Sequence, residues 1–140
     1  MLSRESTALW TGSIGDGSGK MRFGEYEGTF SVPSRFEHGE GTNPEELIGA
    51  AHAGCFSMQL SALLTRAGHA PDEISTTAKV SLEKQDAGWT IVQIDLTTVG
   101  RVPGIDEPTF LDHANEAKET CPVSKALSAT PITLDATLAT

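Results

Sequence analysis

The sequence has few basic residues. Its 140 residues include 10 Lys and Arg against 19 Asp and Glu, which gives a net charge of −9 at pH 7. A chain this acidic repels phosphate backbones and anionic lipid headgroups. We therefore expect neither nucleic acid nor a membrane surface among its partners.

Cysteine is scarce, and metal-binding spacings are missing. Two cysteines are too few for a disulfide scaffold, and a cytosolic disulfide is more often transient than structural. Metal-binding residues usually recur at short spacings such as CxxC or HxxxH. Neither spacing occurs among the cysteines and the four histidines, which are His38, His52, His69 and His113. We expect no metal and no bound cofactor.

Leader segments, repeats and linkers are missing too. The N-terminus shows no basic segment followed by an apolar one, as signal peptides do. The longest near-apolar run, residues 47–56, is about half as long as a membrane-spanning helix. An apolar content of 38% with 21% charged residues is typical of a globular chain long enough to bury a core. We expect one cytoplasmic domain over residues 1–140.

The first third of the chain is rich in glycine and predicts short strands. We place them at residues 6–11, 20–26 and 28–32, separated by "GDGSG" at 15–19 and by a tight turn near residues 27–28. A polar loop, "SRFEHGEGT", should follow at residues 34–42.

A long helix is predicted over residues 43–67. Asn43 is a preferred N-cap residue, Pro44 suits the first helical position, and Glu46 completes a capping box. Gly68 supplies a C-cap, and Pro71 prevents the helix from resuming. The helix is apolar almost all round, so other structure must cover it.

The rest of the chain predicts a hairpin, two helices and a last strand. Apolar residues alternate over 73–83 and 92–98 around a turn at 86–88, which indicates a hairpin with one wet face. A helix over 109–120, a short helix from Pro122 and a strand over 132–138 follow. This order indicates an α+β fold. The inward residues should be Ile74, Thr76, Ala78, Val80, Leu82, Val92, Ile94, Leu96, Thr98, Phe110, Ala114 and Ala117.

The long helix predicts a dimer. About 25 residues extend roughly 37 Å at 1.5 Å per residue, which exceeds the roughly 30 Å diameter of a compact domain of this size. An apolar helix that overruns its own domain is best covered by a second copy. We predict an intertwined homodimer with the two helices paired at its centre.

Cys121 has a setting that favours reactivity. Pro122 at a first helical position makes Cys121 the N-cap, where free N–H groups and the helix dipole favour an anion. Cysteine is an unusual cap compared with Ser, Thr, Asp or Asn. The alternative is a cap filled by whatever residue fits.

Cys55 lies deep in the long helix, beyond the reach of the dipole at its N-terminus. Apolar neighbours raise the pKa of a thiol, so Cys55 alone is best interpreted as a small core residue. It becomes a nucleophile only if a cation reaches it. Arg66 is too far along the same helix, at roughly 16 Å. His52 is on the adjoining face and either pairs with the thiol or packs and bonds a backbone carbonyl.

Arg35, in the preceding loop, is the best-placed cation. Its planar fork of donors can be held by a carboxylate, and Glu45 is free for that role because Glu46 caps the helix. Glu45 and Cys55 are ten residues, or roughly 15 Å, apart along an ideal helix. Arg35 must bridge much of that distance, or the groups belong to two subunits, which favours a site at a dimer interface.

Two segments resemble the OsmC/Ohr family of thiol peroxidases, and its OsmC branch in particular. They are "SRFEHGEGTNPEELIGAAHAGCFSM" at 34–58 and "CPVSKAL" at 121–127. "DAGW", "VPGID" and "ITLDATL" also match that branch. The resemblance implies an α+β fold in which antiparallel sheets of an intertwined homodimer wrap two long central helices.

The resemblance also implies roles for four residues. Cys55 matches the peroxidatic cysteine and Cys121 the resolving cysteine, while Arg35 and Glu45 match the pair that activates the first thiol. The family reduces organic hydroperoxides in preference to hydrogen peroxide and is recycled by external dithiols such as lipoyl groups. An apolar pocket for an alkyl tail should be lined by residues such as Phe36, Phe56 and Met58.

Two other classes of function remain open. One is a redox sensor or thiol-exchange module whose Cys55–Cys121 disulfide is the output. The other is a dimeric ligand-binding domain with inert, buried thiols, which would not react with iodoacetamide at pH 6.

Overall fold

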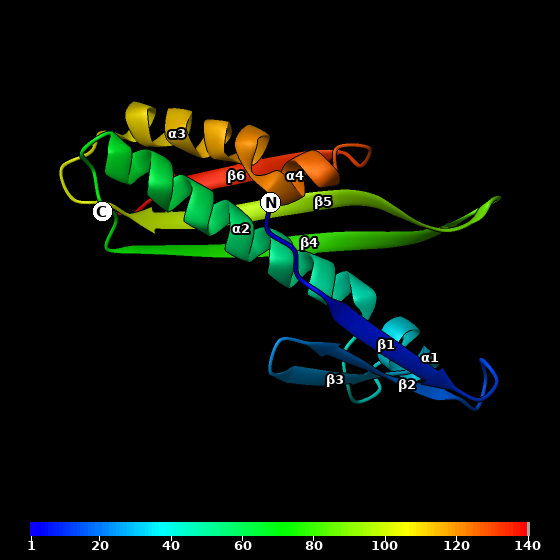
Figure 1. Ribbon diagram of the computed structural model, residues 1–140. Coiled ribbons are helices and arrows are strands. Elements are labelled where there is room, and N and C mark those ends of the chain that lie inside the picture. The colour runs from blue at the N-terminus through cyan, green and yellow to red at the C-terminus, as the bar shows by residue number, and fades with distance from the viewer. Residues whose placement is uncertain (140) are drawn as a thin grey trace. The chain divides into compact units, whose positions relative to one another are not determined.

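The computed structural model describes residues 1–139, and the chain divides into two compact units (Figure 1). The first is Met1–Leu47 and the second begins at Ile48, so the boundary lies near the start of the long helix α2 (Pro44–Arg66). The elements follow in the order β1-β2-β3-α1-α2-β4-β5-α3-α4-β6. This α+β order matches the predicted one except for the additional helix α1.

The first unit contains a three-stranded antiparallel sheet of β1 (Ser6–Thr11), β2 (Ser18–Phe23) and β3 (Tyr26–Phe30). The strand β1 is confirmed as predicted, while β2 and β3 each begin two residues earlier than predicted. The turn was predicted near residues 27–28. It lies instead at Gly24, whose positive φ of 61° suits a tight turn.

The predicted loop at 34–42 contains a short helix at its start, α1 (Val32–Phe36). Ser31 caps it, accepting a hydrogen bond from the Ser34 backbone N–H while the Ser34 hydroxyl accepts one from the Ser31 backbone N–H. Pro33 in the first turn fits the same pattern. The prediction of a loop here was wrong because this local capping signal was overlooked.

The helix α2 confirms the predicted segment to within one residue at each end. Asn43 Oδ1 accepts from the Glu46 backbone N–H at 2.8 Å, as an N-cap does. The Glu46 carboxylate, however, accepts from the Asn43 side-chain amide, at 2.6 Å, so the capping box is a variant of the predicted one. At the other end, Gly68 has a φ of 86°, and the His69 N–H bonds the Leu64 carbonyl in a Schellman arrangement.

The second unit contains a sheet in the order β4-β5-β6, with β4 (Glu73–Gln85), β5 (Gly88–Arg101) and β6 (Ile132–Leu138). The predicted hairpin of β4 and β5 is confirmed as antiparallel. The strand β6, however, runs parallel to β5. This sheet is therefore mixed rather than antiparallel, because the helices between β5 and β6 return the chain to the end at which β5 began.

The inward face of β5 differs from the prediction at one end. The pairing shifts register so that Ser81 faces Gln93 and Leu82 faces Ile91, which leaves Val92 in a bulge. Ile91, and not Val92, therefore packs against the core. Beyond the bulge, Ile94, Leu96 and Thr98 are buried as predicted.

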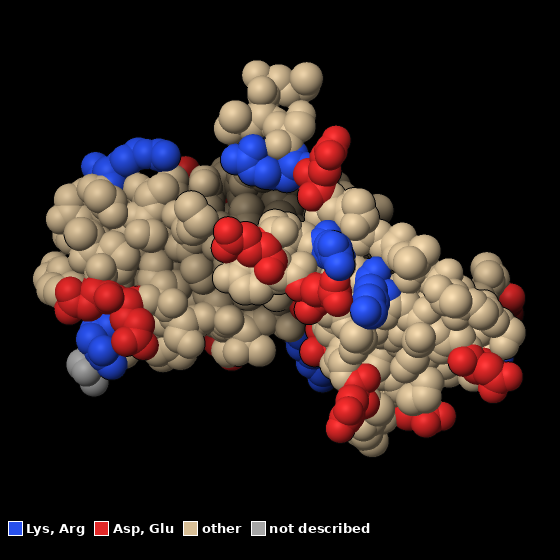
Figure 2. Space-filling view, turned by 60° about the horizontal axis from the view of Figure 1, so that its bottom comes forward, with Lys and Arg blue, Asp and Glu red and all other residues tan. Residues whose placement is uncertain are grey.

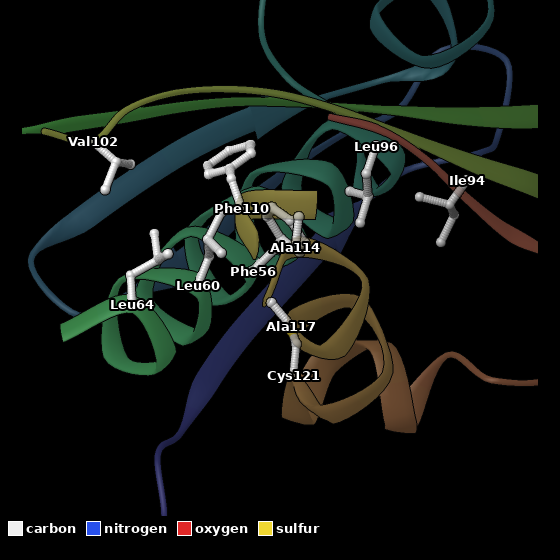
Figure 3. Close-up of a cluster of buried hydrophobic side chains, with 10 residues drawn as sticks. All are labelled: Phe56, Leu60, Leu64, Ile94, Leu96, Val102, Phe110, Ala114, Ala117 and Cys121. Atoms are coloured by element: carbon white, nitrogen blue, oxygen red, sulfur yellow. The ribbon is translucent and has the colours of Figure 1, made fainter. Parts of the chain in front are cut away.

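The core of the second unit lies between the sheet and the helices α2 and α3 (Glu107–Thr120) (Figure 3). The predicted inward residues of α3 are fully buried. Phe110 lies against Gly100 of β5, where any β-carbon would meet its ring. Cys121 lies next to Ala117 at one end of the cluster. The cluster comprises Phe56, Leu60, Leu64, Ile94, Leu96, Val102, Phe110, Ala114, Ala117 and Cys121.

Within this chain α2 buries only one stripe of its surface. The stripe runs through His52, Phe56, Leu60 and Leu64, all fully buried. By length and composition α2 could cross a membrane, but core helices of soluble proteins pass the same test, so this is weak evidence for a membrane span.

In the view of Figure 2, acidic and basic side chains are interspersed and separated by uncharged surface.

Candidate active site

The two thiols meet although they lie 66 positions apart in the sequence. Cys55 lies in the middle of α2, and Cys121 joins the end of α3 to the start of α4 (Pro122–Ala126). Their Sγ atoms are 2.9 Å apart, and both cysteines are free thiols. A small movement would bring the two sulfurs to bonding distance, so this pair can form a disulfide.

Cys121 is held by the backbone rather than by its thiol. Its N–H donates to the Ala117 carbonyl at 2.9 Å, and its own carbonyl accepts from the Lys125 N–H at 3.0 Å. The predicted N-cap position is confirmed, but the side chain makes no capping hydrogen bond. The thiol is instead fully buried and directed to Cys55.

The surroundings of Cys55 act on its acidity in two directions. Burial raises the pKa of its thiol, and the Cys121 sulfur raises it further, both as a hydrogen-bond partner and as a like charge. The backbone N–H of Val123, in the first turn of α4, donates to the Cys55 sulfur and lowers that pKa. The N-terminus of α4 thus lowers the pKa of Cys55. From the sequence pattern, that helix end was expected to act on Cys121 alone.

Two side-chain hydrogen bonds flank the thiol pair. His52 Nε2 lies 2.7 Å from the Ser124 hydroxyl, and Gln59 Nε2 donates to the Thr120 hydroxyl at 2.8 Å. His52 thus bonds a hydroxyl rather than the thiol or a backbone carbonyl. The roles of Ser124, Thr120 and Gln59 were missed because they depend on how α2 docks against α3 and α4.

Arg35 and Glu45 form a bidentate pair in the first unit. Arg35 Nε donates to both carboxylate oxygens of Glu45, at 3.0 and 3.2 Å, and Nη2 donates at 2.7 Å. Asn43 Nδ2 supports this arrangement by donating to the Ser34 carbonyl at 3.0 Å, which ties α1 to the start of α2. The carboxylate is nearly buried, with 10% of the side chain exposed, while Arg35 keeps 37% exposed. The predicted partnership of the two residues is therefore present, with the guanidinium accessible.

The three residues predicted to line a substrate pocket lie in different settings. Phe36 in the first unit packs its ring against the Arg35 guanidinium, 5.3 Å from ring centre to Cζ. Phe56 is fully buried in the core of the second unit. Met58 is exposed beside a groove of about 270 Å³ at the start of β4. The pocket itself stays a prediction.

Metal ligands do not cluster in the part of the chain that the structure describes. No group of three or more His, Cys, Asp or Glu residues among residues 1–139 could hold a metal ion.

Two curated relatives align with most of the chain. The chain is 47% identical to Peroxiredoxin OsmC of Escherichia coli (strain K12) over 137 residues, which cover 96% of this chain and 95% of the relative. It is 33% identical to the Organic hydroperoxide resistance protein of Xanthomonas axonopodis pv. citri over 89 residues, covering 63% of this chain and 61% of that protein.

Solved structures share the fold. The OsmC-like protein from Mycoplasma pneumoniae matches with a TM-score of 0.81 at 16% identity, over 99% of both chains. An organic hydroperoxide resistance protein from Legionella pneumophila matches with a TM-score of 0.72 at 20% identity, over 100% of both chains. The family model described as OsmC-like protein matches residues 37–136. With the thiol pair in place, these similarities show that the chain belongs to the OsmC family.

Proposed function

We propose that this protein is a cysteine-based peroxidase that reduces organic hydroperoxides to alcohols. The observation that carries the proposal is the approach of Cys55 Sγ and Cys121 Sγ to 2.9 Å. Relatives named Peroxiredoxin OsmC and Organic hydroperoxide resistance protein support the same chemistry.

The first step oxidises Cys55. Its thiolate attacks one oxygen of the hydroperoxide, the O–O bond breaks, and the alkoxide leaves and takes up a proton to become an alcohol. The sulfur is oxidised to sulfenic acid while the peroxide is reduced. Because burial raises the pKa of the Cys55 thiol, this step needs a group that stabilises the thiolate more than the Val123 N–H alone does.

The second step uses Cys121. Its thiol attacks the sulfenic sulfur of Cys55, the S–O bond breaks, and water leaves, which yields the Cys55–Cys121 disulfide. An external dithiol then reduces this disulfide by two exchanges and becomes oxidised itself. We propose a lipoyl group, free or on a protein, as that dithiol.

Arg35 is the proposed source of the positive charge. A guanidinium stabilises the thiolate first and the departing alkoxide afterwards, so one group acts in the ground state and the transition state. The bidentate bonds from Arg35 to Glu45 fix the orientation of the fork and leave Nη1 outside the bonded set. We propose that Arg35 and Glu45 of one copy serve Cys55 of a second copy, because Glu45 and Cys55 are about 15 Å apart along α2.

Mixed dimers test this sharing. Cys55→Ser and Arg35→Met chains are each expected to be inactive or slow as homodimers. Dimers that combine the two chains contain one intact site if the residues come from different copies, so peroxide turnover should reappear on mixing. Mixed dimers that stay as slow as Arg35→Met would place all the residues of a site on one chain.

The proposed homodimer has physical support in α2. Ala50, Ala51, Gly54 and Met58 are exposed in this chain, although the helix is apolar. A second copy of α2 would bury these residues, as the sequence predicted. Sedimentation at micromolar concentration should give twice the chain mass of 14.8 kDa, and a single-chain mass there would remove both the dimer and the shared site.

Peroxide consumption tests the function directly. With a lipoyl dithiol as reductant, cumene hydroperoxide should be reduced many times per dimer and faster than hydrogen peroxide, because an alkyl tail gains from apolar contacts. A redox sensor would instead form the disulfide once and turn over slowly. A protein that consumes neither peroxide is not a peroxidase. The thiol cycle also requires a reducing compartment, which fits the proposed cytoplasmic location.

A further inference from the structure

Three residues of α2 lie on one face of the helix at positions i, i+3 and i+7: His52, Cys55 and Gln59. Each contacts a residue of the segment where α3 ends and α4 begins. The three contacts are His52–Ser124, Cys55–Cys121 and Gln59–Thr120, at 2.7, 2.9 and 2.8 Å. The thiol pair is thus the middle one of three aligned contacts.

The contact on one side of the thiols is buried. His52 is fully buried and Ser124 is 5% exposed. His52 Nδ1 has no hydrogen-bond partner among the described residues. A buried N–H without an acceptor costs more than a bare lone pair, so the ring proton belongs on Nε2 and is donated to the Ser124 hydroxyl. Burial also lowers the pKa of His52, which favours this neutral form.

The contact on the other side is partly open to solvent. Gln59 Nε2 donates to Thr120 Oγ1, and that hydroxyl donates onward to the Glu116 carbonyl at 2.8 Å. The Thr120 hydroxyl therefore accepts one hydrogen bond from Gln59 and donates its single proton to Glu116. Water can compete for the amide, so this contact should hold the segment less firmly than the buried one.

We propose that His52 and Gln59 are positioning residues that hold Cys121 against Cys55 through Ser124 and Thr120. The role depends on the proposed function, since it concerns the second step of that cycle. Two bonded points, one on each side, prevent the segment from sliding or lifting away from α2. The Cys121 thiol then stays near the Cys55 sulfur while sulfenic acid forms there.

The benefit is the speed of disulfide formation. An intramolecular attack gains from a high effective concentration only if the reacting groups are held in place. Cys121 attacks the sulfenic sulfur, and water leaves as the S–S bond forms. When this attack is slow, a second peroxide oxidises the sulfenic acid to sulfinic acid, which a dithiol does not reverse.

A single-turnover experiment separates the two steps. Fully reduced protein is mixed with one equivalent of cumene hydroperoxide. Trapping of sulfenic acid by dimedone, followed by mass spectrometry, gives the rate of the first step. Loss of the Cys121 thiol gives the rate of the second. The quantity compared among variants is the second rate divided by the first.

The variants should form a graded series. Ser124→Ala should lower the ratio about tenfold, as expected when a buried hydrogen bond is lost. Gln59→Ala should lower it by about threefold, because its bond is partly exposed. His52→Gln keeps a side-chain amide donor near the place of Nε2 and should recover most of the ratio, whereas His52→Leu should not.

The matched control is Ser57→Ala. Ser57 also anchors α2 by a hydroxyl bond of 2.8 Å, but to Thr76 of β4 and not to the segment that contains Cys121. It should lower stability without changing the ratio. If Ser124→Ala folds and keeps the wild-type ratio, or if Ser57→Ala lowers the ratio equally, the positioning role is wrong.

A second measurement is independent of peroxide. Equilibration of the Cys55–Cys121 pair with dithiothreitol gives the equilibrium constant for disulfide formation, which Ser124→Ala and His52→Leu should lower about tenfold by reducing the effective concentration of the thiols. Unchanged constants would overturn the positioning role. If the variants lower this constant as expected but the wild-type protein does not react with hydroperoxide, the peroxidase proposal alone is refuted.

Discussion

The two pairs that carry the proposed chemistry have opposite surroundings. Cys55 and Cys121 meet at the end of an apolar core, where Cys121 is fully buried beside Ala117. Arg35 and Glu45 form a charged pair with the guanidinium partly exposed. The apolar setting brings the sulfurs together but raises the pKa of Cys55. Because an unpaired buried charge is costly, Arg35 is paired with its own carboxylate, Glu45.

The comparison shows that each pair lacks what the other has. The thiol pair has two adjacent sulfurs, but among the described residues the backbone hydrogen bond from Val123 is the one contact that lowers the pKa of Cys55. The charged pair has an oriented cation but no nucleophile. Variants that damage one pair should therefore produce different failures from variants that damage the other.

The largest effect is expected within the thiol pair itself. Cys55→Ser removes the nucleophile and should abolish turnover of cumene hydroperoxide, while Cys121→Ser should reduce one equivalent and then stall with an oxidised Cys55. Dithiol-dependent consumption and the mass of the oxidised protein measure both outcomes. Steady turnover by Cys121→Ser would mean that the dithiol resolves Cys55 without it.

The next effect tests the charged pair. Arg35→Met should slow the first oxidation of Cys55 about 10²-fold or more, the loss typical of one stabilising donor. Arg35→Lys keeps the charge but not the fork and should be intermediate, and Glu45→Gln should fall between wild type and Arg35→Met. Stopped-flow measurement of thiol loss gives the rates. A wild-type rate in Arg35→Met would show that another cation activates Cys55.

The pKa of the Cys55 thiol tests independently whether Arg35 stabilises its thiolate. If Arg35 offsets the raised pKa of Cys55, its removal should shift the pH profile of iodoacetamide alkylation to higher pH, because less thiolate is present at each pH. The measurement is best made in Cys121→Ser, where only one thiol reacts. Superimposable profiles with and without Arg35 would contradict the proposed activation.

Local signals explain what the sequence predicted correctly. Asn43, Pro44 and Gly68 marked the ends of α2 because capping depends on a few adjacent residues. The signal at Ser31 was equally local and was overlooked. By contrast, the bulge at Val92 and the parallel pairing of β6 depend on neighbouring strands, which no short segment specifies.

The site was predictable to a similar degree. The resemblance to the OsmC/Ohr family supplied the pairing of Cys55 with Cys121, since they lie 66 positions apart and no local pattern joins them. The donor to Cys55 from Val123 and the bond from His52 to Ser124 arise only when α4 docks on α2. Sequence spacing can place residues on a helix face, but it does not identify what the face contacts.

A smaller effect concerns stability in acid. The pKa of folded His52 lies below its usual 6.5 because the ring is buried. Well above pH 6.5 His52 is neutral in both the folded and the unfolded chain, so it does not make the free energy of unfolding depend on pH. As the pH falls below 6.5, the unfolded chain takes up a proton that the folded chain does not, and stability declines.

Denaturant unfolding between pH 7.5 and 5 should therefore show a decline that His52→Gln reduces. Asp95 and Asp106 have a pKa below their usual 3.8 and lose their contributions only at lower pH, so they do not obscure this range. An equal slope in wild type and His52→Gln would assign the decline to other groups.

The smallest effect should come from Asn43, which contacts the residues next to Arg35 and Glu45. Its Oδ1 caps α2 at the Glu46 N–H, and its Nδ2 donates to the Ser34 carbonyl next to Arg35. Asn43→Ala should lower the free energy of unfolding by about 1 kcal/mol.

Asn43→Asp keeps the acceptor but loses the donor to Ser34 and sets a carboxylate beside Glu46. It should preserve more of the cap yet slow peroxide reduction at least as much as Asn43→Ala. Urea unfolding of both variants measures the loss of stability, and single-turnover rates measure the slowing of peroxide reduction. Should Asn43→Asp retain the full wild-type rate, the bond to Ser34 does not orient Arg35, and the bidentate contact with Glu45 suffices alone.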